Sequence, residues 1–213
     1  MYERSVLVVE DEPFVRGLVA EKLRGNGFKV EVASTAAEAR KIAANTDIDI
    51  VVMDIDLGPG PSGLDLGIAL HKMHPELALV FLTHVPEPRI YGVDVKSVPK
   101  NAAYLLKERL SDPNVLNDAI EAALRDRVGP EFRDDLKPSH PLMNVSKTQL
   151  DVLRMIAKGL SNQQIAEERG TTLRAVENLV NRAIAAAGID AKSKTSARVI
   201  AVREFIRIAG LPE

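Results

Sequence analysis

The first 127 residues alternate between short apolar runs and amphipathic segments with helical spacing. The apolar runs occupy residues 5–9, 29–33, 49–54, 77–83 and 102–107. The helical segments occupy residues 13–26, 35–45, 63–74 and 112–127. Strands joined by helices in this order run parallel, because each helix carries the chain back to the edge of the sheet where the previous strand began. The pattern predicts an α/β domain with a five-stranded parallel sheet and helices on both faces.

One helix is missing from this alternation. A helix belongs between the fourth and fifth runs, but residues 84–101 contain Pro86, Pro88, Gly92 and Pro99. Proline removes a helical hydrogen bond and clashes with the preceding turn, which leaves room for one or two turns. We expect this segment to be irregular.

The rest of the chain has a different pattern. Residues 128–142 (VGPEFRDDLKPSHPL) are polar with three prolines, which is typical of a semi-rigid linker. Beyond them the spacing is helical throughout, with helices predicted at residues 147–159, 162–169, 173–187 and 193–209. Two begin with the capping-box pairs Ser146–Gln149 and Ser161–Gln164. The sequence therefore divides into an α/β domain (1–127), a linker (128–142) and a small all-α domain (143–213).

Charge differs between these parts. Residues 143–213 carry 11 Lys and Arg against 7 Asp and Glu, a net of +4, whereas residues 1–142 have a net of −6. The basic part makes nucleic acid a candidate partner. The chain has no cysteine, which excludes disulfides and thiolate metal sites. Without a signal-like start or an apolar run near about 18 residues, we expect no membrane partner and a cytoplasmic location.

Carboxylates stand where two predicted strands end. Glu10 and Asp11 follow the first strand, and Asp54 ends the third. The ends of parallel strands meet at one edge of the sheet, where functional groups collect. Carboxylates gathered there repel one another unless a cation lies among them, and Mg²⁺ prefers such oxygen ligands. The sequence therefore predicts a Mg²⁺ site.

Two further polar groups stand at the same edge. The fourth strand ends at the hydroxyl of Thr83 and the fifth at the ammonium group of Lys107. Together with the carboxylates and a metal, they form a site that can transfer and hold a phosphoryl group, with Asp54 as the nucleophile.

Residues 1–127 resemble the receiver domain of two-component response regulators. The matching residues are Glu10, Asp11, Asp54, Thr83, Tyr104 and Lys107. The resemblance implies a flavodoxin-like fold and phosphorylation of Asp54 by a sensor histidine kinase in the presence of Mg²⁺. It implies that Asp11, Asp54 and the backbone carbonyl of Asp56 bind the metal, with support from Glu10. Thr83 and Lys107 would contact the phosphoryl group, and Tyr104 would be a switch residue that turns inward on activation.

Three features depart from that family. Glu108 follows Lys107 where receivers place proline, His84 follows Thr83 where a small residue is usual, and the stretch between Thr83 and Lys107 is longer. A phosphatase is the competing interpretation, because haloacid-dehalogenase-type enzymes use two aspartates spaced like Asp54 and Asp56. In those enzymes the pair lies near the first strand, so we expect no enzymatic activity beyond autophosphorylation and autodephosphorylation.

Residues 143–209 resemble the LuxR-type (NarL/FixJ-like) helix-turn-helix domain, most closely in VLRMIAKGLSNQQIA and AVENLVNRAIAAAGI. Helical spacing predicts a core of Leu153, Ile156, Leu160, Ile165, Val176, Val180 and Ile184. Residues 173–187 would then enter the major groove as a recognition helix. The candidate DNA contacts are Thr172, Arg174, Glu177, Asn178, Asn181 and Arg182, with Lys192, Lys194 and Arg198 on phosphates. The family commonly has lysine at the position of Glu177.

The two resemblances together predict a response regulator that forms a homodimer on double-stranded DNA when it is phosphorylated. The alternative is a protein-interaction module that keeps the helix-turn-helix shape and reads no DNA sequence.

Overall fold

A computed structural model describes residues 3–86, 88–137, 140–189 and 196–209. Contacts divide the chain into two compact units. The first consists of residues 1–88 and 93–137, and the second of residues 89–92 and 138–213.

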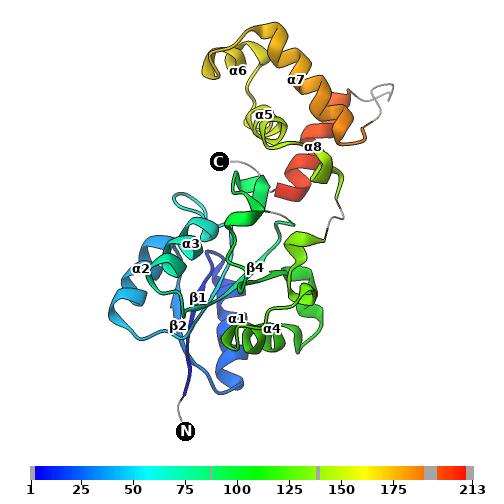
Figure 1. Ribbon diagram of the computed structural model, residues 1–213. Helices are drawn as coiled ribbons and strands as arrows, with labels where there is room; N and C mark the ends of the chain where they lie inside the picture. Colours follow the sequence, from blue (N-terminus) through cyan, green and yellow to red (C-terminus); the bar gives the residue numbers. More distant parts are fainter. Residues whose placement is uncertain (1–2, 87, 138–139, 190–195, 210–213) are drawn as a thin grey trace. The chain divides into compact units, whose positions relative to one another are not determined.

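The first unit contains a five-stranded parallel sheet in the order β2-β1-β3-β4-β5. Its strands are β1 (Ser5–Val9), β2 (Lys29–Ala33), β3 (Ile50–Met53), β4 (Ala78–Thr83) and β5 (Ala103–Leu106). Its α-helices are α1 (Pro13–Gly25), α2 (Ala36–Asn45), α3 (Gly63–Met73) and α4 (Val115–Leu124). Figure 1 shows α1 and α4 on one face of the sheet and α2 and α3 on the other. The predicted five-stranded α/β architecture is confirmed.

The sheet is buried on both faces, which explains why its central strands are continuously apolar. Val6, Val52 and Val80 pack toward α1 and α4, as part of a core that also includes Leu23 and Ile120. On the opposite face, α3 lies very close to the sheet. A side chain at Gly67 would come within 2.7 Å of the ring of Phe81.

The segment between β4 and β5 forms two short 3-10 helices, Pro88–Tyr91 and Val95–Ser97. The expected irregular segment is thus observed in its described residues, and the prolines explain it. Residues 89–92 cluster with the second unit. There the Arg89 guanidinium donates to the backbone carbonyls of Met143 (2.7 Å) and Val145 (2.9 Å).

The end of the first unit differs from the sequence expectation. The last helix is shorter than the expected 112–127, and a 3-10 helix, Lys107–Ser111, lies between β5 and that helix. Residues 128–137, expected to be linker, cluster with this unit. They contain the 3-10 helices Pro130–Phe132 and Asp134–Leu136, which contact β5.

The second unit is helical, with α5 (Lys147–Ala157), α6 (Asn162–Glu168), α7 (Leu173–Ala186) and α8 (Ala197–Ala209). Both predicted capping boxes, at Ser146 and Ser161, are present. Six of the seven predicted core residues are buried, and Leu160 is half-buried. Among the described residues, no helix is long and apolar enough to cross a membrane.

Candidate phosphoryl and nucleic-acid sites

The acidic residues meet because β1 and β3 end at the same level. Val9 pairs with Met53, and the next amide, that of Asp54, donates to the Val9 carbonyl at 2.9 Å. Glu10 and Asp54 therefore leave the sheet side by side, and both are buried. Asp11, which is exposed, completes the group. Carboxylate oxygens of the three residues lie within 4.8 Å of one another.

Lys107 is the counter-charge of this group. Its Nζ lies 2.6 Å from Asp54 Oδ2 and 2.8 Å from Glu10 Oε2, and its side chain is only 6% exposed. Burial opposes the ammonium charge, but Asp54 and Glu10 outweigh it and raise the pKa of Lys107. Burial also raises the pKa of Glu10 to about 7, and the neighbouring Asp54 charge acts in the same direction. The site is thus short of positive charge even with Lys107 in place.

The donor set fits a hard cation. Glu10 Oε1 is buried and receives no hydrogen bond within the described part of the chain. A buried carboxylate oxygen of this kind is costly unless a ligand satisfies it. Oxygen donors from Glu10, Asp11 and Asp54 are those that Mg²⁺ takes, with water in its other positions.

The backbone around Asp54 holds its carboxylate in place. Oδ1 accepts hydrogen bonds from the amides of Ile55 (2.5 Å) and Asp56 (3.3 Å), which leaves Oδ2 facing Lys107. The side chain of Asp56 is exposed. Gly63, the first residue of α3, packs directly on this turn, and a Cβ there would lie 1.8 Å from the Asp54 carbonyl oxygen.

Arg16 also positions the site, a role that its sequence position does not predict. Its Nη1 donates to the backbone carbonyls of Glu10 (2.6 Å) and Asp11 (3.1 Å). The guanidinium thus fixes the loop that carries two of the carboxylates. A half-buried arginine on a helix gives no sequence signal for this role, because its partners are backbone atoms.

Thr83 and Tyr104 converge on one residue, Val85. Thr83 Oγ1 accepts a hydrogen bond from the Val85 amide (3.2 Å), and the Tyr104 hydroxyl donates to the Val85 carbonyl (2.7 Å). Both side chains are completely buried. The Tyr104 ring lies beside Phe81, with 6.0 Å between ring centroids. The structure therefore shows Tyr104 pointing inward and bonded to the segment that follows Thr83.

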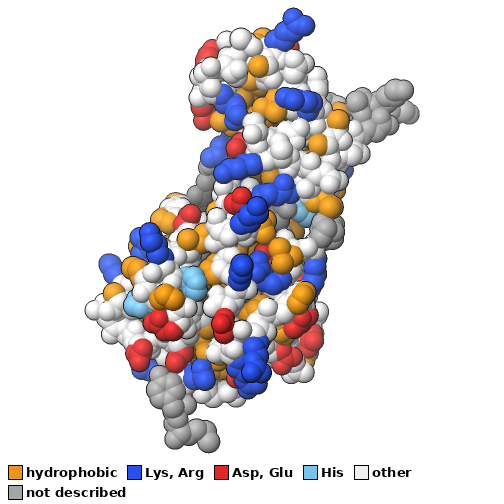
Figure 2. All heavy atoms as spheres, viewed as in Figure 1, with side chains coloured by type: hydrophobic (Ala, Val, Ile, Leu, Met, Phe, Trp, Pro, Cys, Tyr) orange, Lys and Arg blue, Asp and Glu red, His pale blue; other side chains and the backbone are white. Residues whose placement is uncertain are grey.

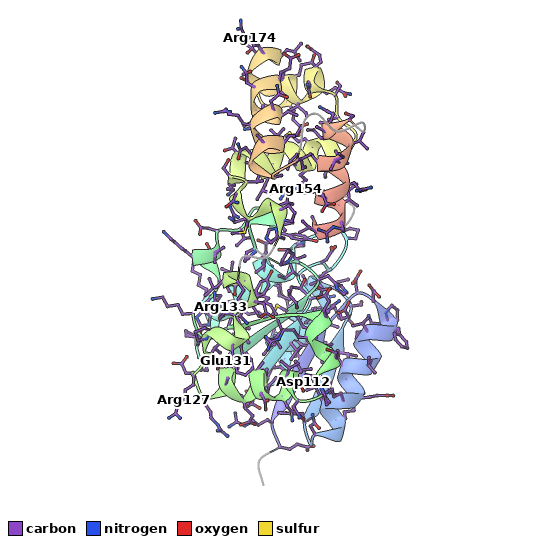
Figure 3. All side chains as sticks on the ribbon, turned by 90° about the vertical axis from the view of Figure 1, so that its right-hand side faces the viewer. Asp112, Arg127, Glu131, Arg133, Arg154 and Arg174 are labelled. Atoms are coloured by element: carbon purple, nitrogen blue, oxygen red, sulfur yellow. The ribbon has the colours of Figure 1, made fainter. Side chains whose placement is uncertain are left out.

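In the second unit, α7 presents the predicted polar row to solvent. Arg174, Glu177, Asn178, Asn181 and Arg182 are all exposed. Figure 3 shows Arg174 at the amino-terminal end of α7, and Lys and Arg side chains are visible on this unit in Figure 2.

The other predicted DNA contacts are placed differently. The Thr172 hydroxyl accepts a hydrogen bond from the Ala175 amide (3.2 Å) and so caps α7. Arg198 donates to Asn162 Oδ1 (2.6 Å) and to the Leu160 carbonyl (3.1 Å), which ties α8 to the α5–α6 turn. Lys192 and Lys194 lie outside the described residues.

Two family models match this chain, one in the α/β unit and one in the helical unit. The family model of the response regulator receiver domain matches residues 6–108. The model of the luxR family of bacterial regulatory proteins matches residues 143–198.

Individual proteins match over most of the length of this chain. The nitrate/nitrite response regulator protein NarP of Escherichia coli (strain K12) is 33% identical over 175 residues, which cover 76% of this chain and 78% of NarP. The oxygen regulatory protein NreC of Staphylococcus haemolyticus is 27% identical over 70% of this chain and 75% of NreC. RcsB of Salmonella enterica, solved on the promoter rprA with the phosphomimetic BeF3−, shares the fold with a TM-score of 0.60. That match covers 95% of this chain and 98% of RcsB at 16% identity.

Proposed function

This chain belongs to the transcriptional response regulators that join a receiver domain to a LuxR-type DNA-binding domain, and we propose that phosphorylation of Asp54 controls its binding to specific DNA. The observation that carries the proposal is the buried Glu10–Asp54–Lys107 cluster at the carboxyl edge of the sheet. A sensor histidine kinase is the proposed phosphodonor. Because the target is chromosomal DNA, the proposed place of action is the cytoplasm.

Asp54 acts as the nucleophile in this proposal. Its carboxylate attacks phosphorus, the bond to the donor breaks, and an acyl phosphate forms on Asp54. Lys107, already 2.6 Å from Asp54 Oδ2, supplies a positive charge beside the new phosphoryl oxygens. The Thr83 hydroxyl would leave the Val85 amide to donate to one of these oxygens.

Glu10, Asp11, Asp54 and the backbone carbonyl of Asp56 are the proposed Mg²⁺ ligands. When bound there, Mg²⁺ supplies the positive charge that neutralises phosphoryl oxygens during transfer. Burial and the neighbouring Asp54 charge raise the pKa of Glu10 although Lys107 acts against them, and a bound cation would favour the charged form of Glu10.

The donor needs a docking surface near Asp11, and α1 offers one. Phe14 is 81% exposed and Leu18 is 56% exposed. They lie one helical turn apart, on the helix that begins two residues after Asp11. We propose that this apolar pair contacts the kinase. Phe14→Ser should then slow phosphorylation by the kinase while phosphorylation by acetyl phosphate stays unchanged.

DNA reading is assigned to the exposed row of α7. Asn178 and Asn181 can form paired hydrogen bonds with adenine, and Arg174 and Arg182 can contact guanine or phosphate. Asn178→Ala should therefore lower the preference for the cognate sequence. Lys158→Ala, which removes an exposed charge at the end of α5, should leave that preference unchanged.

Two copies are proposed to pair through α8. Val199 is 57% exposed, and Val202 and Ile206, on the same face of the helix, are half-buried. Two protomers on a palindromic pair of half-sites are related by two-fold symmetry, and a contact between them would stabilise that arrangement. Val199→Glu should weaken binding to a paired site far more than binding to a single half-site.

The first experiment is enrichment of fragmented genomic DNA by the full-length protein, with and without acetyl phosphate and Mg²⁺. Specific enrichment that requires the donor in the wild type and is lost in Asp54→Asn supports the proposal. Equal enrichment in both states would show that DNA binding is independent of phosphorylation. If no DNA is enriched in either state, the helical domain is a protein-interaction module instead.

A further inference from the structure

Residues 130–137, named the strap here, lie against the β5 edge of the receiver sheet. The strand order leaves β5 at one edge, and Arg133 forms a parallel bridge to Tyr104 on that strand. The Leu106 amide donates to Asp134 Oδ2 at 3.1 Å. Figure 3 shows Glu131 and Arg133 on this segment beside the sheet. The strap therefore pairs with the strand that carries the switch tyrosine.

A buried ion pair fastens the strap. Arg133 Nε and Nη2 donate to the two oxygens of Asp135 at 2.8 and 2.7 Å, with side chains 10% and 0% exposed. Arg133 Nη1 also donates to the Lys100 carbonyl at 3.4 Å. Burying such a pair gives little net stability, because desolvation offsets the attraction, but it does fix the position of the segment.

A second contact joins the strap to the residues just beyond β5. Arg109 Nη1 donates to the Glu131 carbonyl (2.7 Å) and to Asp134 Oδ1 (3.1 Å). Lys137 Nζ lies 2.8 Å from the same carboxylate oxygen. Asp134 thus binds both the backbone of Leu106 and the side chain of Arg109.

Lys107 lies between these two attachment points. It follows Leu106 directly and precedes Arg109 by two residues. Asp134 accepts hydrogen bonds from both of these neighbours, Leu106 and Arg109. A displacement of Lys107 must therefore strain or shift the strap.

We propose that the strap relays phosphorylation of Asp54 to the DNA-binding domain, an inference that rests on the proposed function. A phosphoryl group on Asp54 changes the position of Lys107, and the attached strap changes its docking on β5. The strap continues directly into the chain that leads to residues 140–209. The strap contacts β5 directly and is attached on both sides of Lys107 in sequence, which places it on a route from the phosphorylation site.

The test uses the full-length protein and the DNA fragment enriched in the selection described above. Arg133→Ala/Asp135→Ala removes both charges together, so that no single buried charge remains. Arg109→Ala loosens the strap at a half-exposed position, in case the double variant does not fold. Arg40→Ala, on the exposed face of α2, is the matched control.

Three quantities are measured with acetyl phosphate and Mg²⁺: phosphorylation of Asp54, the ratio of DNA affinities with and without donor, and hydrogen exchange of the strap amides. We expect the wild type and Arg40→Ala to gain affinity about tenfold with donor, as is common for coupled sites. The strap variants should accept phosphate within about twofold of the wild-type level, but their affinity ratio should fall to about one. Donor should also change exchange of the wild-type strap.

The relay would be overturned if the strap variants kept the wild-type ratio of DNA affinities. It would also be overturned if hydrogen exchange of the strap amides were the same with and without acetyl phosphate. If the wild-type protein is not phosphorylated, or if phosphorylation does not change its DNA affinity, the proposed function is contradicted, and the relay with it. The two failures are distinguishable, because one appears in the wild type and the other only in the variants.

Discussion

Nδ1 of His84 lies 3.0 Å from Oε1 of Glu108, and this pair joins the chain segments that follow β4 and β5. His84 directly follows Thr83, and Glu108 directly follows Lys107. Two of the residues that differ from the expected receiver pattern therefore interact with each other. Their contact connects the two groups that are proposed to hold the phosphoryl group.

Loss of this pair should shorten the lifetime of phosphorylated Asp54. Both side chains are more than 60% exposed, and an exposed pair of this kind contributes at most about 1 kcal/mol, or about fivefold in a rate. Without it, the segments carrying Thr83 and Lys107 open more often to water. We expect Glu108→Gln to hydrolyse the acyl phosphate about two- to fivefold faster, measured after removal of acetyl phosphate.

Salt and a second pair provide the controls for this prediction. High salt screens exposed charges, so about 1 M NaCl should bring the wild-type rate close to that of the variant. Glu76→Gln breaks the exposed His74–Glu76 contact (3.7 Å) and should leave the rate unchanged. An unchanged or slower rate in Glu108→Gln would contradict a restraining role.

Gly63→Ala should destabilise the receiver domain. The added Cβ would meet the Asp54 carbonyl oxygen at 1.8 Å, and because that atom belongs to the backbone, α3 or the Asp54 turn must move. We expect the free energy of unfolding to fall by about 1–3 kcal/mol in a urea titration. Gly17→Ala is the control. It lies in α1 with nothing within 4 Å of the new Cβ, so it should stabilise by about 0.5–1 kcal/mol.

The sequence was sufficient to predict the sheet and the acidic site, because both follow from local patterns. A strand buried on both faces is continuously apolar, and the residues that end neighbouring parallel strands must meet. This brought Glu10, Asp54 and Lys107 together in the prediction as in the structure. The prolines before β5 likewise excluded a helix for a local reason.

The strap and the role of Arg198 could not be predicted in the same way. Arg133, Asp134 and Asp135 are charged residues in a proline-containing stretch, and such a composition is typical of a solvated linker. They are buried because their partners lie on β5 and on Arg109, at positions that no periodicity reveals. From its place in the sequence, Arg198 was expected to contact phosphate. In the structure its guanidinium donates hydrogen bonds to Asn162 and to the Leu160 carbonyl.

Asp134→Asn should lower stability in a pH-dependent way. Burial raises the pKa of Asp134, but hydrogen bonds from Lys137, the Leu106 amide and Arg109 outweigh burial and leave the pKa below its usual value. A carboxylate with a lowered pKa stabilises the fold above its unfolded pKa of about 3.9, and this stabilisation is lost as pH falls through the folded value. The variant should unfold about 1–3 kcal/mol more easily at pH 7.

The difference between wild type and Asp134→Asn should shrink below about pH 4, as the wild-type carboxylate takes up its proton. Asp47→Asn, at an exposed position before β3, should differ from wild type by less than about 0.5 kcal/mol at every pH. A difference that stays constant from pH 7 to pH 3 would show that Asp134 acts through shape and not through charge.

Glu177→Lys should strengthen DNA binding and make it more sensitive to salt. Glu177 is exposed on α7 in the same row as Arg174 and Asn178, so its carboxylate faces the DNA in the proposed complex and repels phosphates. Each additional phosphate contact releases about one counterion and steepens the slope of log K against log salt by about 0.9. The slope is measured by titrating the enriched DNA fragment at several NaCl concentrations.

Glu168→Lys makes the same change in net charge at the end of α6 and should alter the slope less. Equal slopes for the two variants would place Glu177 away from the duplex, so that other residues of α7 would have to recognise the DNA sequence.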